Sequence, residues 1–464
     1  MSSESPDQAA LVLQLLGRHG WNASSFQTME RGFRYHFLGV DACVAYVDTG
    51  RAWVAAGAPI AAAERLDEVA GSFVAAATAA GRRALFFGTE ARFAERPQFR
   101  ALLVGEQPVW DPGDWPRTLA GAASIREQLR RARRKGVTVR AIASAEIADA
   151  TQPLRRSIET LIERWLRARP LAPMGFLVDI QPFSFPEARR YFVAEQGKVV
   201  VGFLAAVPIY ARGGWLFEDM LRSPEAANGT IELLVDVAMR ALADEGSGFV
   251  TLGLAPLAGA VPGWLGLIRR LSASLYDFAG LHAFRTKLRP GRWDPIYLSV
   301  PRARGQTARD APLGDAVADT VAIFDVLSAF ARGRLLGFGL RTLLRGPALV
   351  VRLLGLLLLP WMALLALAPA RFFPAPALRW AWIGFDLLLA TALLALAARW
   401  RRPLASALAL AVTIDAVVTA AEVALYNLGR VEKPWDWLVL ALALAAPSAA
   451  SIILWNAIGH RRRG

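Results

Sequence analysis

The segment EDMLRSPEAANGTIELL, which begins at Glu218, combines acidic, basic and glycine residues in one predicted strand–loop–helix unit. The strand ends at Glu218 and Asp219, and Arg222 follows. Gly229 then begins a helix that carries Glu232. Free backbone N–H groups at a helix N-terminus attract anions, and carboxylates can hold an ammonium group or act as a general base. The pattern predicts a substrate site, although a structural ion pair between Asp219 and Arg222 would explain part of it.

A second candidate group lies in the segment LYDFAGLHAFRTKLRPGRWDPIYLSV, which ends in a predicted strand. Only four of the 53 basic residues of the chain are lysines, and one of them, Lys287, falls here. Lysine is a compact charge with a tunable pKa, whereas arginine is a permanently charged fork. A lysine retained in such an arginine-biased chain indicates a role in a site, although chance retention explains a single lysine equally well.

The segment SIREQLRRARRKG is predicted to form a strongly basic helix. Its basic residues are Arg126, Arg130, Arg131, Arg133, Arg134 and Lys135. Such density is typical of contact with a phosphate backbone, as in tRNA. Anionic lipid headgroups would be bound equally well, and a merely solvated basic face is the third interpretation.

The composition of the 464 residues limits the chemistry that this chain can perform. There are 53 basic and 39 acidic residues, a formal charge of +14, which favours phosphate-rich partners such as nucleic acid or an anionic membrane. The single cysteine, Cys43, excludes an internal disulfide and a cysteine-based metal cluster. Four scattered histidines offer little for a zinc site or a Ser–His–Asp triad. We therefore expect no metal and no cofactor, and the N-terminus lacks the pattern of a signal peptide.

Strands and helices are predicted in two similar blocks, 1–117 and 118–302, which indicates an α/β (α+β) fold of two units, each a mixed sheet flanked by helices. In the first block we predict two strands within 41–57, a helix over 62–80 and a strand near 100–110. In the second we predict a helix over 146–169, strands at 190–196, 198–209 and 214–220, and a helix over 229–245. The intervening stretch WDPGDWPRT is predicted to be a linker.

The last third of the chain is predicted to associate with a membrane. Residues 303–345 are expected to form a polar linker and then an amphipathic helix on the membrane surface, with an ordinary connector helix as the alternative. Residues 346–464 contain four apolar stretches, near 347–369, 380–398, 404–428 and 437–458. Each approaches the roughly 20 residues that a spanning helix needs, which predicts a bundle of four transmembrane helices.

The distribution of arginines predicts how these spans are oriented. Arg399, Arg401 and Arg402 fill the second loop, and three arginines close the chain. The positive-inside rule then places the N-terminal region and the C-terminus on the cytoplasmic side of the membrane. Three acidic residues lie within the predicted spans, where charges are costly: Asp386, Asp415 and Glu422. They indicate either a polar headgroup path or hydrogen bonds between helices.

Four segments in order, GFLAAVPIY, EDMLRSPEAANGTIELL, TLGLAPL and the segment that contains Lys287, resemble the C-terminal catalytic domain of the lysyl-phosphatidylglycerol synthases, the multiple peptide resistance factor family. The resemblance covers about residues 10–302. It implies two tandem acetyltransferase-like (GNAT-like) units that move an aminoacyl group from aminoacyl-tRNA to phosphatidylglycerol. Typical members carry their membrane helices before this domain, whereas here the apolar stretches follow it.

The resemblance also implies roles for individual residues. Asp219 and Arg222 match the Asp-x-x-Arg pattern of the family, and with Glu232 and Lys287 they are the expected catalytic groups. An acid would hold the substrate ammonium or act as base, and a basic residue would hold the lipid phosphate or the tRNA 3′ end. The expected substrate-binding residues are Glu218, Gly229, Gly253, Arg285, Arg289 and Trp293.

Two other functions stay open from the sequence. An acyl-CoA-dependent lipid acyltransferase would share the fold, but the loop SPEAANG after Arg222 lacks the paired glycines that let a backbone approach the CoA pyrophosphate. A non-catalytic module that binds lipid or tRNA is the other alternative. The intact set of acidic and basic residues argues against it.

Overall fold

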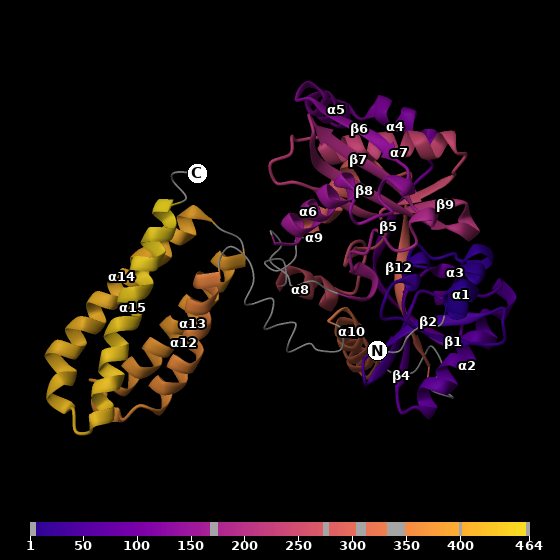
Figure 1. The fold of residues 1–464 in the computed structure, drawn as a ribbon. Helices are drawn as coiled ribbons and strands as arrows, with labels where there is room; N and C mark the ends of the chain where they lie inside the picture. The colour runs from indigo at the N-terminus through magenta and orange to yellow at the C-terminus, as the bar shows by residue number, and fades with distance from the viewer. Residues whose placement is uncertain are drawn as a thin grey trace. The chain divides into compact units, whose positions relative to one another are not determined.

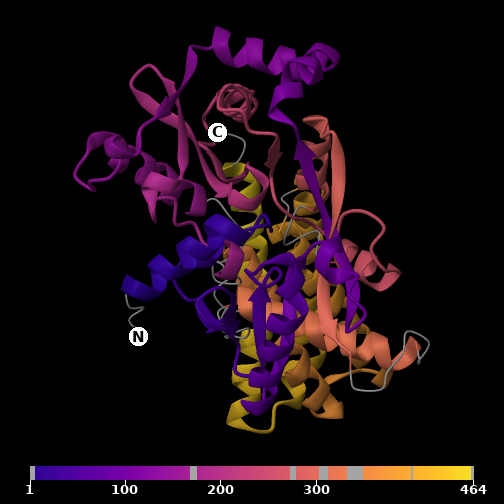
Figure 2. The ribbon, with the colours of Figure 1, turned by 90° about the vertical axis from the view of Figure 1, so that its right-hand side faces the viewer.

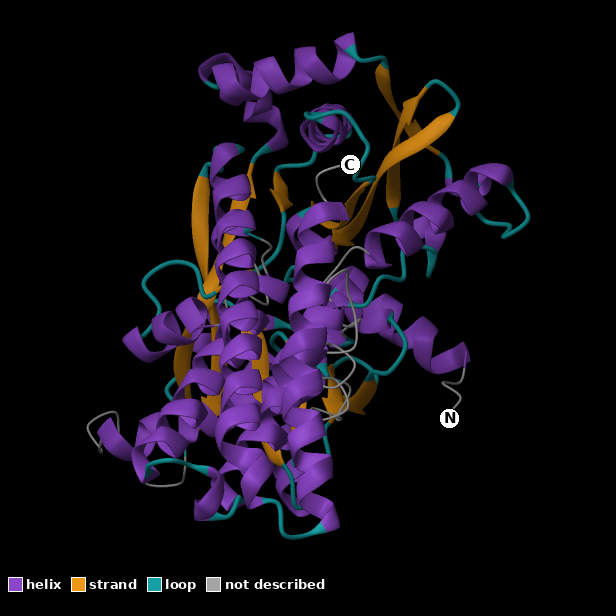
Figure 3. Ribbon diagram, turned by 90° about the vertical axis from the view of Figure 1, so that its left-hand side faces the viewer, coloured by secondary structure: helices purple, strands orange, loops and turns teal. Residues whose placement is uncertain are grey.

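The computed structural model describes residues 6–167, 175–271, 278–302, 312–331, 349–398 and 401–460. The chain divides into two compact units, one of residues 1–169 with 173–338 and one of residues 170–172 with 339–464. All described strands belong to the first unit, and the described part of the second consists of helices and their connections (Figures 1 and 3).

A 12-stranded mixed sheet forms the centre of the first unit. Its strands are β1 (Arg34–Phe37), β2 (Cys43–Asp48), β3 (Ala52–Ala56), β4 (Arg83–Thr89), β5 (Phe99–Trp110), β6 (Val137–Ile142), β7 (Arg190–Gln196), β8 (Val199–Ile209), β9 (Gly214–Arg222), β10 (Phe249–Thr251), β11 (Ala255–Pro256) and β12 (Arg292–Pro301). Their spatial order is β1-β2-β3-β4-β12-β5-β10-β9-β8-β7-β6, and β11 pairs with β5.

The sheet joins the two predicted blocks. Strand β12 comes last in sequence, yet it lies between β4 and β5 of the first block, and β5 also pairs with β10 of the second. Figure 2 shows β5 and β12 side by side. The mixed sheet with flanking helices that the sequence predicts is therefore confirmed. The strands of the two predicted blocks, however, belong to one continuous sheet.

Helices cover the sheet where the apolar periodicity requires it. They are α1 (Pro6–His19), α2 (Leu66–Ala79), α3 (Ala91–Ala94), α4 (Trp115–Gly121), α5 (Ala123–Arg134), α6 (Pro153–Arg167), α7 (Thr230–Asp244), α8 (Gly263–Leu271), α9 (Phe278–Lys287) and α10 (Pro312–Phe330). In the second block, α5 and α7 pack on the sheet face that carries Leu204 and Phe217. Helix α6 packs on the opposite face, which carries Phe203 and Ala205.

The prediction of a linker between the two blocks is wrong. Residues 112–121 form a short 3-10 turn and α4, and Trp115 is fully buried in the core beneath α7. Its indole Nε1 donates a 3.0 Å hydrogen bond to Asp236. The proline and glycine content that indicated a loop instead allows the chain to turn directly from β5 into a helix.

The predicted polar linker is also wrong over residues 312–320, which belong to α10. Asp319 in this segment and Asp325 later in α10 both turn toward the protein. Asp325 accepts 2.9 and 2.7 Å hydrogen bonds from the guanidinium of Arg83, and Asp319 pairs with Arg100. Most of the predicted surface helix, residues 332–345, lies outside the described residues.

The described residues of the second unit form four packed helices: α12 (Leu349–Leu367), α13 (Pro376–Ala398), α14 (Arg402–Glu422) and α15 (Pro434–His460). Two described segments, Ala377–Ala397 and Arg402–Arg430, are long and apolar enough to cross a membrane. The apolar parts of the other two, Val351–Leu367 and Val439–Trp455, are shorter than the roughly 20 residues required. The predicted bundle of four spans is therefore not confirmed.

Gly229 fixes the packing of α5 against α7. It precedes α7 with a backbone φ of +96°, and a Cβ atom there would lie 2.1 Å from the carbonyl oxygen of Gln128 in α5. Both the conformation and the space therefore require glycine.

We expect Gly229→Ala to lower the denaturation midpoint of the chain well beyond Gly136→Ala. Gly136 also has a positive φ, +77°, but a Cβ there meets nothing within 4 Å. Each substitution should lower the stability by roughly 1–2 kcal/mol, because alanine disfavours the left-handed conformation. Only Gly229→Ala adds a clash with the backbone of α5. Chemical denaturation of the full chain in detergent measures both, and equal midpoints would contradict this packing.

Candidate functional site

A β-bulge in β9 brings Glu218 and Asp219 to the same region. Asp219 lies opposite Ala205 of β8, but Phe217 lies opposite the next residue, Ala206, so Glu218 is the extra residue. Residues directly opposite each other on antiparallel strands share a face, so Asp219 lies on the α6 face of the sheet with Ala205. The bulge therefore places two consecutive carboxylates at one point of the strand, as bulges near sites commonly do.

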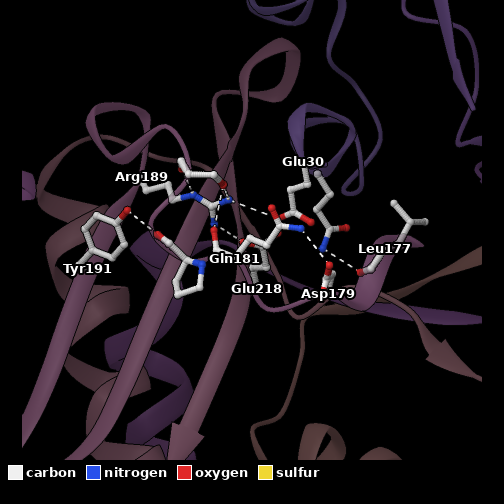
Figure 4. Close-up of polar contacts among 10 residues, drawn as sticks. Glu30, Leu177, Asp179, Gln181, Arg189, Tyr191 and Glu218 are labelled. Carbon is white, nitrogen blue, oxygen red and sulfur yellow. Dashed lines mark hydrogen bonds and ion pairs between the residues drawn. The ribbon is translucent and has the colours of Figure 1, made fainter. Parts of the chain in front are cut away.

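A buried arginine, Arg189, links Glu218 to two other segments (Figure 4). Its guanidinium pairs with Glu218 of β9 and, at 3.4 Å, with Glu30, which follows the first 3-10 helix (Phe26–Met29). Its Nε donates a 2.8 Å hydrogen bond to the carbonyl of Ser184, and its Nη2 donates a 3.0 Å bond to the Ser184 hydroxyl. The side chain of Arg189 is 0% exposed. Three separate segments of the chain therefore meet at one cation.

The acidic groups outnumber this cation and are incompletely bonded. Glu30, Glu218 and Asp219 each keep one buried carboxyl oxygen without a hydrogen-bond partner. Burial, and next the charge of Glu218, raise the pKa of Glu30 above its usual value of 4.5. Burial and Glu218 likewise raise the pKa of Asp219 well above 3.8. The cluster has unused acceptors that a cationic group could satisfy.

An open cavity of about 1040 Å³ lies next to this cluster. Its wall includes Asp179, Gln181 and Ser184, and Ser184 also bonds Arg189 directly. Gln181 donates a 2.9 Å hydrogen bond to Asp179 (Figure 4). Other parts of the wall come from α6, from the β2–β3 turn and from α10. The cavity thus lies on the α6 side of the sheet and is large enough for a substrate of drug size.

Strands β9 and β10 separate at the bulge. Their parallel pairing runs only from Phe249 opposite Gly214 to Thr251 opposite Leu216. Within the described sheet, β9 beyond Leu216 pairs only with β8, which leaves one edge of the bulged segment without a strand partner. Backbone N–H groups at such an edge are available to a ligand.

The other three residues expected to be catalytic lie on the opposite face. Arg222 is opposite Gly202, whose missing side chain faces α7, and it contacts Asn228 at 3.5 Å. Lys287 at the end of α9 forms a 2.6 Å ion pair with Glu232 in the first turn of α7. The structure therefore brings Glu232 and Lys287 together, near the same helix as Arg222, and separates them from Asp219 by the sheet.

The expected substrate-binding residues divide in the same way. Glu218 joins the Arg189 cluster, whereas Gly229 packs against α5. Arg285 is buried and donates a 2.7 Å hydrogen bond to the carbonyl of Leu252, next to Gly253. Arg289 is exposed and bonds the Gly121 carbonyl, and Trp293 stacks on His282 at 4.8 Å. Only Glu218 of this group lies at the carboxylate cluster.

The basic helix is α5, and most of its charges have protein partners. Arg130 and Arg134 both pair with Glu127. Arg133 pairs with the buried Asp236, and Arg126 donates to carbonyls at the end of α4. Among the described residues, Arg131 and Lys135 form no salt bridge. The free charge on this surface is therefore smaller than the sequence indicates.

The three acidic residues expected within the spans lie on α13 and α14. Asp415 accepts a 3.4 Å hydrogen bond from Thr419 and lines a cavity of about 350 Å³ whose other walls are apolar. Asp386 is buried, and Glu422 ends α14. The described residues of the chain include no group of three or more His, Cys, Asp or Glu side chains that could hold a metal ion.

Sequence analysis missed Glu30 and Arg189, which define the cluster. Glu30 is 159 residues from Arg189 in sequence, and neither lies in a recognisable motif. Burial of both side chains is a tertiary property, so no local pattern could have identified them.

Comparisons with known proteins address the first unit. Residues 13–300 match the family described as "Phosphatidylglycerol lysyltransferase, C-terminal". The lysylphosphatidylglycerol biosynthesis bifunctional protein LysX of Mycobacterium marinum is 30% identical over 161 residues, which are 33% of this chain and 14% of that protein. An uncharacterised protein of Corynebacterium glutamicum is 26% identical over 155 residues, 31% of this chain and 20% of that protein. The chain thus matches a minor part of the length of these relatives.

Two solved structures share the fold of the first unit. The C-terminal domain of a putative lysylphosphatidylglycerol synthetase from Agrobacterium fabrum aligns with a TM-score of 0.57 at 21% identity, covering 71% of this chain and 99% of that one. L-PGS from Bacillus licheniformis aligns with a TM-score of 0.55 at 20% identity, covering 64% of this chain and 92% of that one.

The raised pKa of Glu30 predicts how stability depends on pH. Above pH 4.5 an unfolded Glu30 loses its proton while the folded one keeps it, so the folded state binds more protons and stability falls as pH rises. One such group lowers the free energy of unfolding by up to about 1.4 kcal/mol per pH unit. We expect Glu30→Gln to reduce this loss of stability between about pH 6 and pH 9.

Denaturation midpoints of the full chain across this range provide the measurement. The matched control is Glu245→Gln, a partly exposed glutamate paired with Arg190. It should leave the wild-type slope unchanged. Identical slopes for Glu30→Gln and the wild type would show that Glu30 titrates as an ordinary glutamate.

Proposed function

We propose, because the chain belongs to the phosphatidylglycerol lysyltransferase C-terminal family, that it transfers an aminoacyl group from aminoacyl-tRNA to phosphatidylglycerol. The family supports aminoacylation of a lipid in general. The tRNA donor and the choice of phosphatidylglycerol come from the resemblance and from the name of the family. Attachment to the bacterial inner membrane is part of the proposal, which the two apolar helices of the second unit support.

The observation that carries the proposal is the excess of carboxylates beside the cavity. An aminoacyl ester presents an ammonium group, and the side chain of a lysyl group presents a second one. Glu30, Glu218 and Asp219 offer three unbonded oxygens around the single cation Arg189. An ammonium would satisfy these acceptors and favour their ionised forms. The cluster is therefore suited to hold the amino group of the transferred residue.

The reaction itself demands little chemistry, because the donor ester is already activated. The lipid hydroxyl attacks the ester carbonyl, a tetrahedral oxyanion forms, and the terminal ribose hydroxyl of the tRNA leaves. Asp219 is the proposed base, because its carboxylate lies at the bulge beside the unpaired edge of β9, where it can accept the hydroxyl proton and return it to the leaving oxygen. Backbone N–H groups at the edge of β9 beyond Leu216 are the proposed oxyanion donors.

The two faces of the sheet suggest different partners. Helix α5 packs on α7, so its arginines, Arg222 and Lys287 share the α7 face. We assign this face to the phosphates of the tRNA 3′ end. The cavity on the α6 face, with Arg31, Arg34 and Arg155 in its wall, is assigned to the lipid.

Acyl-CoA is a poorer donor for this site. An acetyltransferase-like fold would bind pyrophosphate at the N-terminus of α7. Here the start of that helix is packed against the carbonyl oxygen of Gln128, which repels an anion. This packing argues against an acyl-CoA donor.

The first test measures transfer to phosphatidylglycerol by mass spectrometry of lipids from membranes that contain the full chain. Synthesis should stop on RNase treatment. We expect Asp219→Asn and Glu218→Gln each to reduce transfer by about two orders of magnitude, the scale of losing a positioned charge or donor. Glu245→Gln, outside the cluster, should retain activity. Synthesis that persists after RNase with acyl-CoA alone would refute the proposed donor.

The second test concerns the tRNA surface. We expect Arg131→Gln with Lys135→Gln to weaken tRNA binding and to reduce the slope of log affinity against log salt by somewhat under one unit per lost phosphate contact. These two residues have no ion-pair partner among the described residues, so their loss should not disturb folding. The matched control is Arg51→Gln, an exposed arginine on the turn between β2 and β3, at the other end of the sheet from α5 and β6. An unchanged salt slope in the double variant would remove α5 from the tRNA surface.

A further inference from the structure

Helix α10 turns its acidic side chains toward the protein and its apolar side chains outward. Its charged residues Asp319 and Asp325 are buried against the protein and paired with Arg100 and Arg83. Its outward face carries Val321, Phe324 and Leu327, which are 37%, 54% and 48% exposed. A helix at a water-exposed surface shows the reverse arrangement.

The outward residues form one apolar stripe. Val321, Phe324 and Leu327 are spaced by three residues, which places them on neighbouring turns of one side of the helix. The opposite side contributes Ala322, Val326 and Ala329 to the core of the first unit. Both sides of α10 are therefore apolar, and only one of them is covered by the first unit.

Chain continuity and charge identify the occupant of this stripe. Only 17 residues separate Ala331 from α12, and they include Arg332, Arg334, Arg341 and Arg345. Fully extended, such a segment spans at most about 60 Å, and it leads into a unit with two helices long enough to cross a membrane. Apolar side chains followed directly by a run of arginines match the boundary between acyl chains and anionic headgroups.

We propose that the stripe of Val321, Phe324 and Leu327 inserts into the surface of an anionic bilayer and so orients the first unit on the membrane. The ion pairs with Arg83 and Arg100 hold α10 rigidly on the sheet, so the orientation of the helix sets the orientation of the unit.

The same helix forms part of the candidate substrate cavity. Ala329 lines the cavity, and the carbonyl of Phe330 accepts a 2.9 Å hydrogen bond from Gly175, another residue of the wall. Insertion of the outward stripe therefore brings the cavity to within about one helix diameter, roughly 10 Å, of the lipid surface. This second step rests on the proposed function, because it gives the lipid acceptor a route into the cavity along α10.

The test uses the full chain in vesicles of phosphatidylglycerol and phosphatidylethanolamine, with single cysteines at Val321, Phe324 or Leu327. Cys43 is fully buried and serves as the unlabelled background. An environment-sensitive dye on each cysteine is exposed to brominated lipids and, separately, to aqueous iodide. The control site is Val199, a 61% exposed valine of the same unit. We expect bromolipid quenching on α10 to exceed that at position 199 several-fold, and iodide quenching to show the opposite order.

Two outcomes would overturn the proposal. Strong iodide quenching on α10 would leave the stripe in water, and protection from both quenchers would mean that protein covers it, either the second unit or a second copy. The double variant Phe324→Asp with Leu327→Asp should also raise the apparent KM for vesicle lipid several-fold and leave transfer to a dispersed short-chain phosphatidylglycerol unchanged. Val199→Asp should change neither. Because quenching requires no transfer, bromolipid quenching without any lipid product would support the docking and reject the proposed function.

Discussion

The contacts of the Arg189 guanidinium hold the candidate site together. It is fully buried, and its partners come from the loop before β1, from the loop at Ser184 and from the bulge of β9. A charge in that position is tolerable only with carboxylate partners, and removing one member of a buried pair typically costs about 3–5 kcal/mol. The cation therefore fixes the relative positions of segments that no single strand or helix connects. The carboxyl oxygens that it leaves unbonded are what make the cluster more than a structural ion pair.

The sheet gives this cluster its orientation. The bulge at Glu218 places consecutive acidic residues next to each other where an undistorted strand would send them to opposite faces. At the same point β10 ends its pairing with β9, so the bulged edge is accessible to a ligand. A regular, fully paired strand would have supplied neither the second carboxylate nor the free backbone donors. The irregularity is thus a feature of the candidate site that the regular strands on either side hold in place.

Local patterns predicted the elements well and the site only in part. The strands at 190–196, 198–209 and 214–220 and the helix at 229–245 were predicted within one or two residues, because alternation and turn residues define them. The two blocks share one sheet in part because β12 lies between β4 and β5. These strands are far apart in sequence, so local patterns could not predict their pairing. Asp219 and Lys287 were selected together from the sequence, but the face of a strand cannot be known once a bulge changes its register. Glu30 and Arg189 became identifiable only through burial.

The errors at Trp115 and in α10 both arise from side-chain contacts between segments that are distant in sequence. The indole of Trp115 donates a hydrogen bond to Asp236 of α7, and Asp325 of α10 accepts hydrogen bonds from Arg83 of β4. At Trp115 the result is an ordinary core contact. In α10 the inward turn of the acids leaves the apolar side chains outside, where water is an unfavourable neighbour. A sheet that carries basic groups on its α7 face and an apolar stripe on the helix beside its cavity would meet a polyanionic donor from the water and a lipid from the bilayer without either substrate having to leave its own phase.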